Sequence, residues 1–122
     1  MTRIGILLIA GLAALPAAAH ATDVTGVWQV STTIRAAPVV MECSVLQIGV
    51  QLSGWCEPQT SDAVPTALTG QLNETRATWG YDVQDGGRTV HLAYAGTLSG
   101  PLDMTGQLSV GGVAAPFTAM RK

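Results

Sequence analysis

Charged side chains are scarce in this chain: Asp, Glu, Lys and Arg together make up 11% of its 122 residues. The bases form no run and are not interleaved with aromatic residues, which argues against nucleic acid as a partner. No stretch combines an apolar face with a cationic one, so we expect no attachment to a membrane surface. A helical period of useful length is also missing, whereas Gly, Thr, Ser and Val are plentiful, as is typical of an all-β secreted domain.

Side chains that could act in catalysis or bind a metal are equally few. Beyond the first 21 residues His91 is the only histidine, and strand parity places it on an outward face, where we expect an ordinary surface histidine. Asp82 and Asp85 flank a turn, where solvated carboxylates are common, so we assign them no paired-acid catalysis. The sequence has no nucleophile elbow, P-loop or dinucleotide motif. We predict no catalytic residue, metal site or cofactor, although enzymatic activity that depends on shape alone stays open.

The first 21 residues, Met1–Ala21, have the features of a secretory signal peptide. Arg3 precedes an apolar run, Ile4–Leu15, which is shorter than the roughly 20 residues that a membrane span requires. Ala19-His20-Ala21 then supplies a small-x-small cleavage site. We expect cleavage after Ala21, a periplasmic or secreted protein, and no membrane insertion once the signal is removed. An uncleaved anchor is the alternative.

The remaining 101 residues, 22–122, carry eight acids and five bases, hence a net charge of −3. That length suits one domain with one hydrophobic core. Alternating apolar and polar residues, interrupted by Gly-, Pro- and Asn-containing turns, predict eight strands within it. The predicted strands are Gly26–Thr33, two strands within Met41–Cys56, Ala67–Leu72, Arg76–Gln84, Arg88–Leu98, Leu102–Val110 and Val113–Met120.

Both cysteines lie in the stretch Met41–Cys56. If Cys43 and Cys56 face each other across a hairpin, the midpoint of the hairpin falls between Gly49 and Val50. These two residues then form the turn, and Gly in the first turn position is typical of a type II′ turn. Counting outward from that turn makes the two cysteines a non-hydrogen-bonded pair, whose Cα atoms lie about 4.5 Å apart. This separation suits a disulfide. We therefore predict a Cys43–Cys56 disulfide bond, and two free buried cysteines are the alternative. The bond would leave too few ligands for a zinc site, and it agrees with export to an oxidising compartment.

Most of the predicted strands are joined by short turns, with longer breaks at Arg35–Pro38 and Glu57–Ala63. An eight-stranded antiparallel up-and-down meander can remove its exposed edges by closing into a barrel. A two-sheet sandwich is the competing architecture, but it usually needs longer crossing connections. Glycines recur on the inward faces of the strands at Gly54, Gly70, Gly96 and Gly106. They either bend the strands for closure or hollow out a ligand cavity.

The ends of the predicted barrel resemble the calycins, the group that includes lipocalins and avidins. Thr25-Gly26-Val27-Trp28 opens the first strand and Arg121 ends the last, and Leu68-Thr69-Gly70 followed by Trp79 fits the avidin branch. The resemblance implies that Trp28 lies at the closed end of the barrel beneath Arg121, as a structural cation–π pair. Biotin binding is not implied, because the inward residues are mostly aliphatic. The single disulfide and the chain length also resemble small periplasmic inhibitors of secreted metalloproteases.

Two functions of different classes fit this domain. A barrel interior could bind a small apolar or aromatic ligand that is uncharged at its buried end, since no strand interior points an Arg or Lys inward. Alternatively, the domain binds another protein or a second copy of itself through the outward face of the 41–56 hairpin. Three apolar residues, Leu46, Ile48 and Trp55, cluster on that face. A competing explanation is that the 57–63 loop or the N-terminal segment covers them. Whether the interior is hollow or filled stays open. The candidate ligand-lining residues are Trp79, Tyr81, Leu92, Tyr94, Met104 and Phe117.

Overall fold

The computed structural model describes residues 23–59 and 64–122. The predicted signal peptide, Met1–Ala21, lies outside the described residues, and so do residues 60–63 of the predicted Glu57–Ala63 loop. Every regular element in the described part is a β-strand. No helix among these residues is long and apolar enough to cross a membrane.

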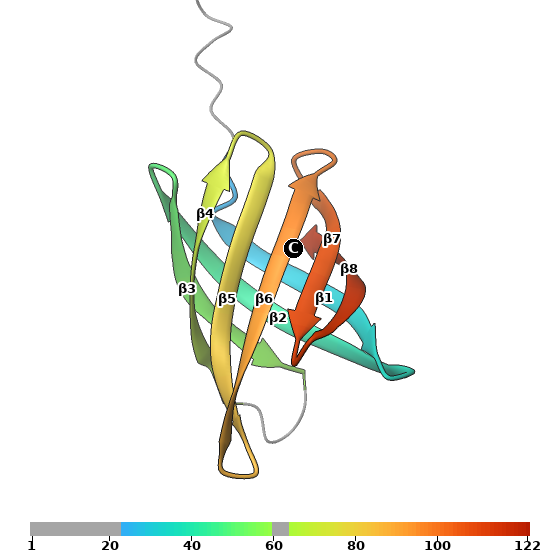
Figure 1. Ribbon diagram of the computed structural model, residues 1–122. Coiled ribbons are helices and arrows are strands. Elements are labelled where there is room, and N and C mark those ends of the chain that lie inside the picture. Colours follow the sequence, from blue (N-terminus) through green and yellow to red (C-terminus); the bar gives the residue numbers. More distant parts are fainter. Residues whose placement is uncertain (1–22, 60–63) are drawn as a thin grey trace, which may run out of the picture.

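Eight antiparallel strands follow one another around a closed barrel (Figure 1). Each strand pairs with the next in the sequence, and the last pairs with the first, so the sheet has no free edge and the sandwich alternative is excluded. The predicted fold class is therefore confirmed. The strands are β1 (Gly26–Ile34), β2 (Ala37–Ile48), β3 (Gln51–Pro58), β4 (Thr66–Asn73), β5 (Arg76–Asp85), β6 (Arg88–Leu98), β7 (Asp103–Val110) and β8 (Val113–Arg121).

The hairpin of β2 and β3 has the predicted register. Ile48 pairs with Gln51 beside the turn, and Cys43 pairs with Cys56, with their Cα atoms 4.0 Å apart and a disulfide between them. Gly49 has a φ of 64°, which is the backbone conformation that the first position of a type II′ turn requires. The turn thus closes one end of this pairing, and the disulfide links the two strands near the other end.

The predicted break at Arg35–Pro38 is wrong. Only Arg35 and Ala36 form the turn, and β2 already begins at Ala37. Both turn residues have positive φ values, 52° and 66°, as in a type I′ hairpin turn. The usual sequence signal for that turn is Asn-Gly or Asp-Gly, because residues with a Cβ adopt positive φ at a cost. Arg-Ala carries no such signal, so the sequence alone gave no reason to expect a tight turn here.

The buried side chains follow the predicted alternation along the strands. One buried residue, Val24, was not predicted, because it precedes β1. Leu102, predicted as the first residue of a strand, instead precedes β7, which begins at Asp103, and is 54% exposed. The core consists of Val24, Trp28, Val30, Met41, Cys43, Leu52, Cys56, Leu68, Leu72, Ala77, Tyr81, Tyr94, Met104, Leu108, Phe117 and Ala119.

The glycines within the strands allow close backbone approach and do not hollow out the barrel. A Cβ on Gly70 would lie 2.0 Å from the carbonyl oxygen of Thr78, and one on Gly106 would lie 2.0 Å from that of Ala95. At Gly96 an added Cβ would instead meet core side chains at 2.8 Å. The space that these glycines leave is therefore already occupied by neighbouring strands or by the core.

Candidate binding surfaces

One end of the barrel is closed around Trp28. Arg121, its partner across β1 and β8, places its guanidinium carbon 5.1 Å from the centre of the indole ring. The Trp28 Nε1–H group donates to the carbonyl oxygen of Val24 at 2.9 Å, and Arg121 Nη2 donates to that of Asp23. These contacts hold the segment before β1 across the barrel end, so Trp28 and Arg121 are placed as a structural pair.

The aromatic residues proposed to line a ligand site instead pack against one another. The rings of Trp79 and Tyr94 stack with their centres 4.8 Å apart, and Phe117 meets both rings edge-on at 5.5 and 5.4 Å. Such contacts stabilise a core beyond the area that they bury. Of the six candidate lining residues, Tyr81, Tyr94, Met104 and Phe117 are buried, and Trp79 and Leu92 are half-buried.

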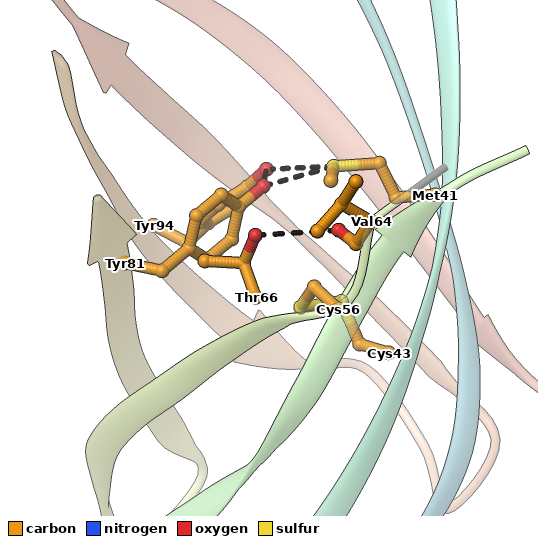
Figure 2. The surroundings of a disulfide bond; sticks show 7 residues. All are labelled: Met41, Cys43, Cys56, Val64, Thr66, Tyr81 and Tyr94. Carbon is orange, nitrogen blue, oxygen red and sulfur yellow. Dashed lines mark hydrogen bonds between the residues drawn. A yellow bond between two sulfur atoms is a disulfide. The ribbon is translucent and has the colours of Figure 1, made fainter. Parts of the chain in front are cut away.

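The hydroxyl groups of Tyr81 and Tyr94, two of the candidate lining residues, also bind each other. Their oxygens lie 2.7 Å apart, and the Tyr81 hydroxyl donates to Met41 Sδ at 2.9 Å (Figure 2). Burial raises the pKa of both phenols above the ordinary value, so both stay protonated. Met41 was not among the candidate residues, although its inward parity with Cys43 could have shown it. Both hydroxyl groups therefore have hydrogen-bond partners within the core without a bound ligand.

The interior next to Trp28 and Trp79 holds a cavity of only about 20 Å³. Typical small-molecule sites measure roughly 300–1,000 Å³. A water could fit by volume, but a buried water also needs several polar partners, and the side chains around this cavity are almost all apolar. The buried Nε1–H group of Trp79 has no hydrogen-bond partner in the described part of the chain. At this end, therefore, the barrel is filled by its own side chains.

The outer surface of β2 and β3 presents the predicted apolar cluster to solvent. Trp55 is 57% exposed, Leu46 49% and Ile48 69%. Trp55 lies across from Ser44, and Leu46 lies across from Ser53, so the three apolar side chains share one face with hydroxyl groups between them. We call Leu46, Ile48 and Trp55 the outer hairpin face. None of the described residues buries it.

Two grooves flank Trp55, and its side chain contributes to both. One groove, of about 630 Å³, includes Leu46, Gly54 and Ala67, with hydroxyl groups around it. The other, of about 450 Å³, is formed by Trp55 with Glu42, Ser44, Glu57 and Pro65. The indole therefore separates a largely apolar groove from one that carries two carboxylates.

His91 lies on the outside of the barrel, as its parity predicted. Its Nδ1 atom is 2.7 Å from Asp82 Oδ1, and both side chains are largely exposed. Within residues 23–59 and 64–122, no three His, Cys, Asp or Glu side chains come close enough together to hold a metal ion. The structure thus gives no further role to the His91–Asp82 pair.

These features define a small up-and-down β-barrel with a closed end, one disulfide and a packed interior, consistent with a calycin-like barrel. No protein-family model matches the sequence. No curated protein matches it either.

Among solved structures, the chain resembles redesigned β-barrels. One is mFAP1 bound to DFHBI, with 14% identity, a TM-score of 0.61, and coverage of 80% of this chain and 94% of that one. Another is the redesigned barrel b11L5F_LGL, with 13% identity, a TM-score of 0.63, and coverage of 80% and 90%. A third, mFAP0 bound to DFHBI, is 14% identical with a TM-score of 0.55, and the match covers 80% of this chain and 97% of that one. At these identities the likeness establishes the fold alone.

Proposed function

We propose that this protein is an exported, non-enzymatic binding module that recognises another protein through the outer hairpin face. One observation carries the proposal: the described interior cavity measures about 20 Å³, while Trp55 stands 57% exposed between two surface grooves. Clustered exposed apolar side chains often mark interaction surfaces, and Trp is enriched among residues that dominate binding energy.

The export part of the proposal is supported by two sequence features that agree with each other. Met1–Ala21 has the charge, apolar run and cleavage pattern of a secretory signal. The Cys43–Cys56 disulfide would persist in an oxidising compartment but is unusual in a reducing one. N-terminal sequencing of the protein from its native cells should begin at Thr22. A chain that begins at Met1 would contradict export by cleavage.

The binding part is tested by removing the outer hairpin face without disturbing the core. The variant Trp55→Ser with Ile48→Ser changes two solvent-exposed side chains, so the barrel should fold normally. A matched control, Leu102→Ser with Val113→Ser, changes an exposed apolar residue in the β6–β7 connection and another at the first position of β8. Each purified protein is used to recover partners from the exported proteins of its native cells, and its association state is measured by sedimentation.

Loss of a recovered partner in the face variant but not in the control supports the proposal, whereas loss of self-association alone would identify a second copy of this chain as the occupant and contradict it. Circular dichroism and a cooperative thermal transition show that the variant is folded. Equal recovery and an unchanged association state in the folded face variant would end the proposal.

A second function, binding of a small uncharged aromatic or apolar molecule inside the barrel, is favoured by one observation. The Trp79 Nε1–H group is buried beside the aromatic cluster and has no described hydrogen-bond partner, so an acceptor on a ligand would satisfy it. Neighbours of the same fold, mFAP1 and mFAP0, are described as bound to DFHBI. In this chain such a ligand would have to displace the rings of Trp79, Tyr94 or Phe117.

Thermal-shift titrations with DFHBI and with naphthalene test this second function. Because a ligand that binds only the folded state raises the melting temperature, a saturable rise for the wild-type protein would favour interior binding. The variant Tyr94→Ala removes a buried ring and should admit either probe even if the wild type does not. Binding by Tyr94→Ala alone would show that the native interior is closed to ligands of this size.

A further inference from the structure

We infer that the partner presents a basic side chain and an apolar side chain on opposite sides of the Trp55 indole. The inference rests on the proposed function and specifies the chemistry of the partner, a basic segment of another protein. It follows from the different character of the two grooves that meet at Trp55.

The groove on one side of Trp55 carries uncompensated negative charge. Glu42 and Glu57 are directly opposite each other across β2 and β3. Like charges in that arrangement normally destabilise the pairing of the two strands. Lys122 Nζ lies 2.6 Å from Glu42 Oε2, but no residue in the described ranges forms an ion pair with Glu57. A guanidinium or ammonium group bound here would contact the Glu57 carboxylate and the face of the indole together, a salt bridge reinforced by a cation–π contact.

The groove on the other side suits an apolar side chain. Leu46 and Ala67 supply its apolar surface. The hydroxyl groups of Ser44, Ser53 and Thr69 surround it and can bond to the backbone of a bound segment. In an extended segment, residues two apart lie on the same side about 7 Å from each other. A basic and an apolar residue at that spacing could therefore straddle the indole ring.

Charge complementarity selects a basic protein segment over other occupants of this surface. Residues 22–122 carry a net charge of −3, and the carboxylates lie within the proposed contact area. A second copy docked symmetrically would add a second set of Glu42 and Glu57 carboxylates to the same interface and no compensating cation. Nucleic acids and anionic lipid surfaces would likewise be repelled. A basic segment would be attracted, and its association would weaken as salt rises.

Three synthetic peptides probe this inference against the disulfide-bonded protein labelled with ¹⁵N. The first is a blocked hexapeptide, Ser-Leu-Thr-Arg-Thr-Ser; the second replaces Arg by Glu, and the third replaces Leu by Ser. Binding is followed by NMR through the indole Nε1–H signal of Trp55, which the variant Trp55→Phe identifies. Titrations of the first peptide are repeated with Glu57→Gln and with Glu74→Gln, a matched change in the β4–β5 turn.

The Leu–Arg peptide should shift the Trp55 signal saturably, and each of the other two should bind more weakly by about tenfold or more, equivalent to about 1.4 kcal/mol. Glu57→Gln should weaken the first peptide several-fold, as should raising the salt from about 0.05 to 0.5 M, whereas Glu74→Gln should leave it unchanged. Equal binding of the Arg and Glu peptides, no effect of Glu57→Gln, or no shift at Trp55 with the first peptide would overturn the inference.

Failure of this inference can be told apart from failure of the proposed function. If Trp55→Ser with Ile48→Ser abolishes partner recovery while Glu57→Gln and added salt do not, the outer hairpin face binds a partner but the partner is not basic. If the face variant also leaves recovery unchanged, both the surface and the chemistry assigned to it are wrong.

Discussion

The hydroxyl oxygens of Tyr81 and Tyr94 lie 2.7 Å apart inside a largely apolar barrel. With Met41 Sδ they form a closed network in which each hydroxyl has a partner. Buried hydroxyl groups without partners would cost the fold stability. The same network uses both hydroxyl protons, so neither hydroxyl is free to donate to a ligand inside the barrel.

The tyrosine pair should make the protein less stable in alkali. These are the only two tyrosines in the chain, and burial raises the pKa of both. Above about pH 10 the tyrosines of the unfolded chain lose their protons while the folded ones keep theirs. The free energy of unfolding should therefore fall as pH rises, by at most about 1.4 kcal/mol per pH unit for each tyrosine. Urea unfolding at a series of pH values measures this slope.

The control for that slope is Tyr81→Phe with Tyr94→Phe, which removes both phenols and keeps both rings. Its stability should depend less steeply on pH above about 10 than that of the wild type. An equal slope in the two proteins would show that other groups cause the alkaline loss.

Trp28 and Arg121 should be energetically coupled. Trp28→Ala removes an indole that is almost fully buried and should lower the free energy of unfolding by about 3–5 kcal/mol. Arg121→Ala should cost less, and the double variant less than the sum, because one cation–π contact is lost in both. Urea denaturation of the four proteins gives the coupling energy. Strictly additive losses would show that the contact contributes nothing.

The disulfide should matter for stability rather than for the path of the chain. Cys43 and Cys56 are 13 residues apart, and closing so short a loop stabilises a fold by about 3 kcal/mol in the chain-entropy model. Cys43→Ala with Cys56→Ala should lower the unfolding free energy by about that amount while the far-ultraviolet circular dichroism stays unchanged. Peptide mapping without reductant should recover the bonded pair from the wild-type protein, and two free thiols would refute the bond.

Gly106→Ala should destabilise the barrel, because the new Cβ would lie 2.0 Å from the carbonyl oxygen of Ala95. The strands must separate to admit it, at a cost of about 1–3 kcal/mol. Gly100 is the matched control, since a Cβ there would meet nothing within 4 Å. Thermal unfolding should show a lower melting temperature for Gly106→Ala and little change for Gly100→Ala. Equal stability of the two variants would contradict the close approach of β6 and β7.

The sequence by itself determined the strands, their order and most of their faces. In a β-strand the side chains alternate between two faces, so the pattern of apolar residues gives the inward face without knowledge of the partner strands. The position of Gly49 and the spacing of the cysteines likewise defined the β2–β3 register, because each is a local constraint. The turn at Arg35 and Ala36 was missed because these residues adopt positive φ without the Gly that usually signals it.

Only the tertiary structure decided whether the barrel is hollow or filled. Parity placed Trp79, Tyr94 and Phe117 inside, but it could not show that their rings stack and leave a cavity of only about 20 Å³ beside Trp28. The free volume depends on strand curvature and side-chain rotamers around the whole barrel, and residues distant in the sequence set both. For the same reason the larger groove beside Trp55 became visible only in the tertiary structure, because four neighbouring strands form it.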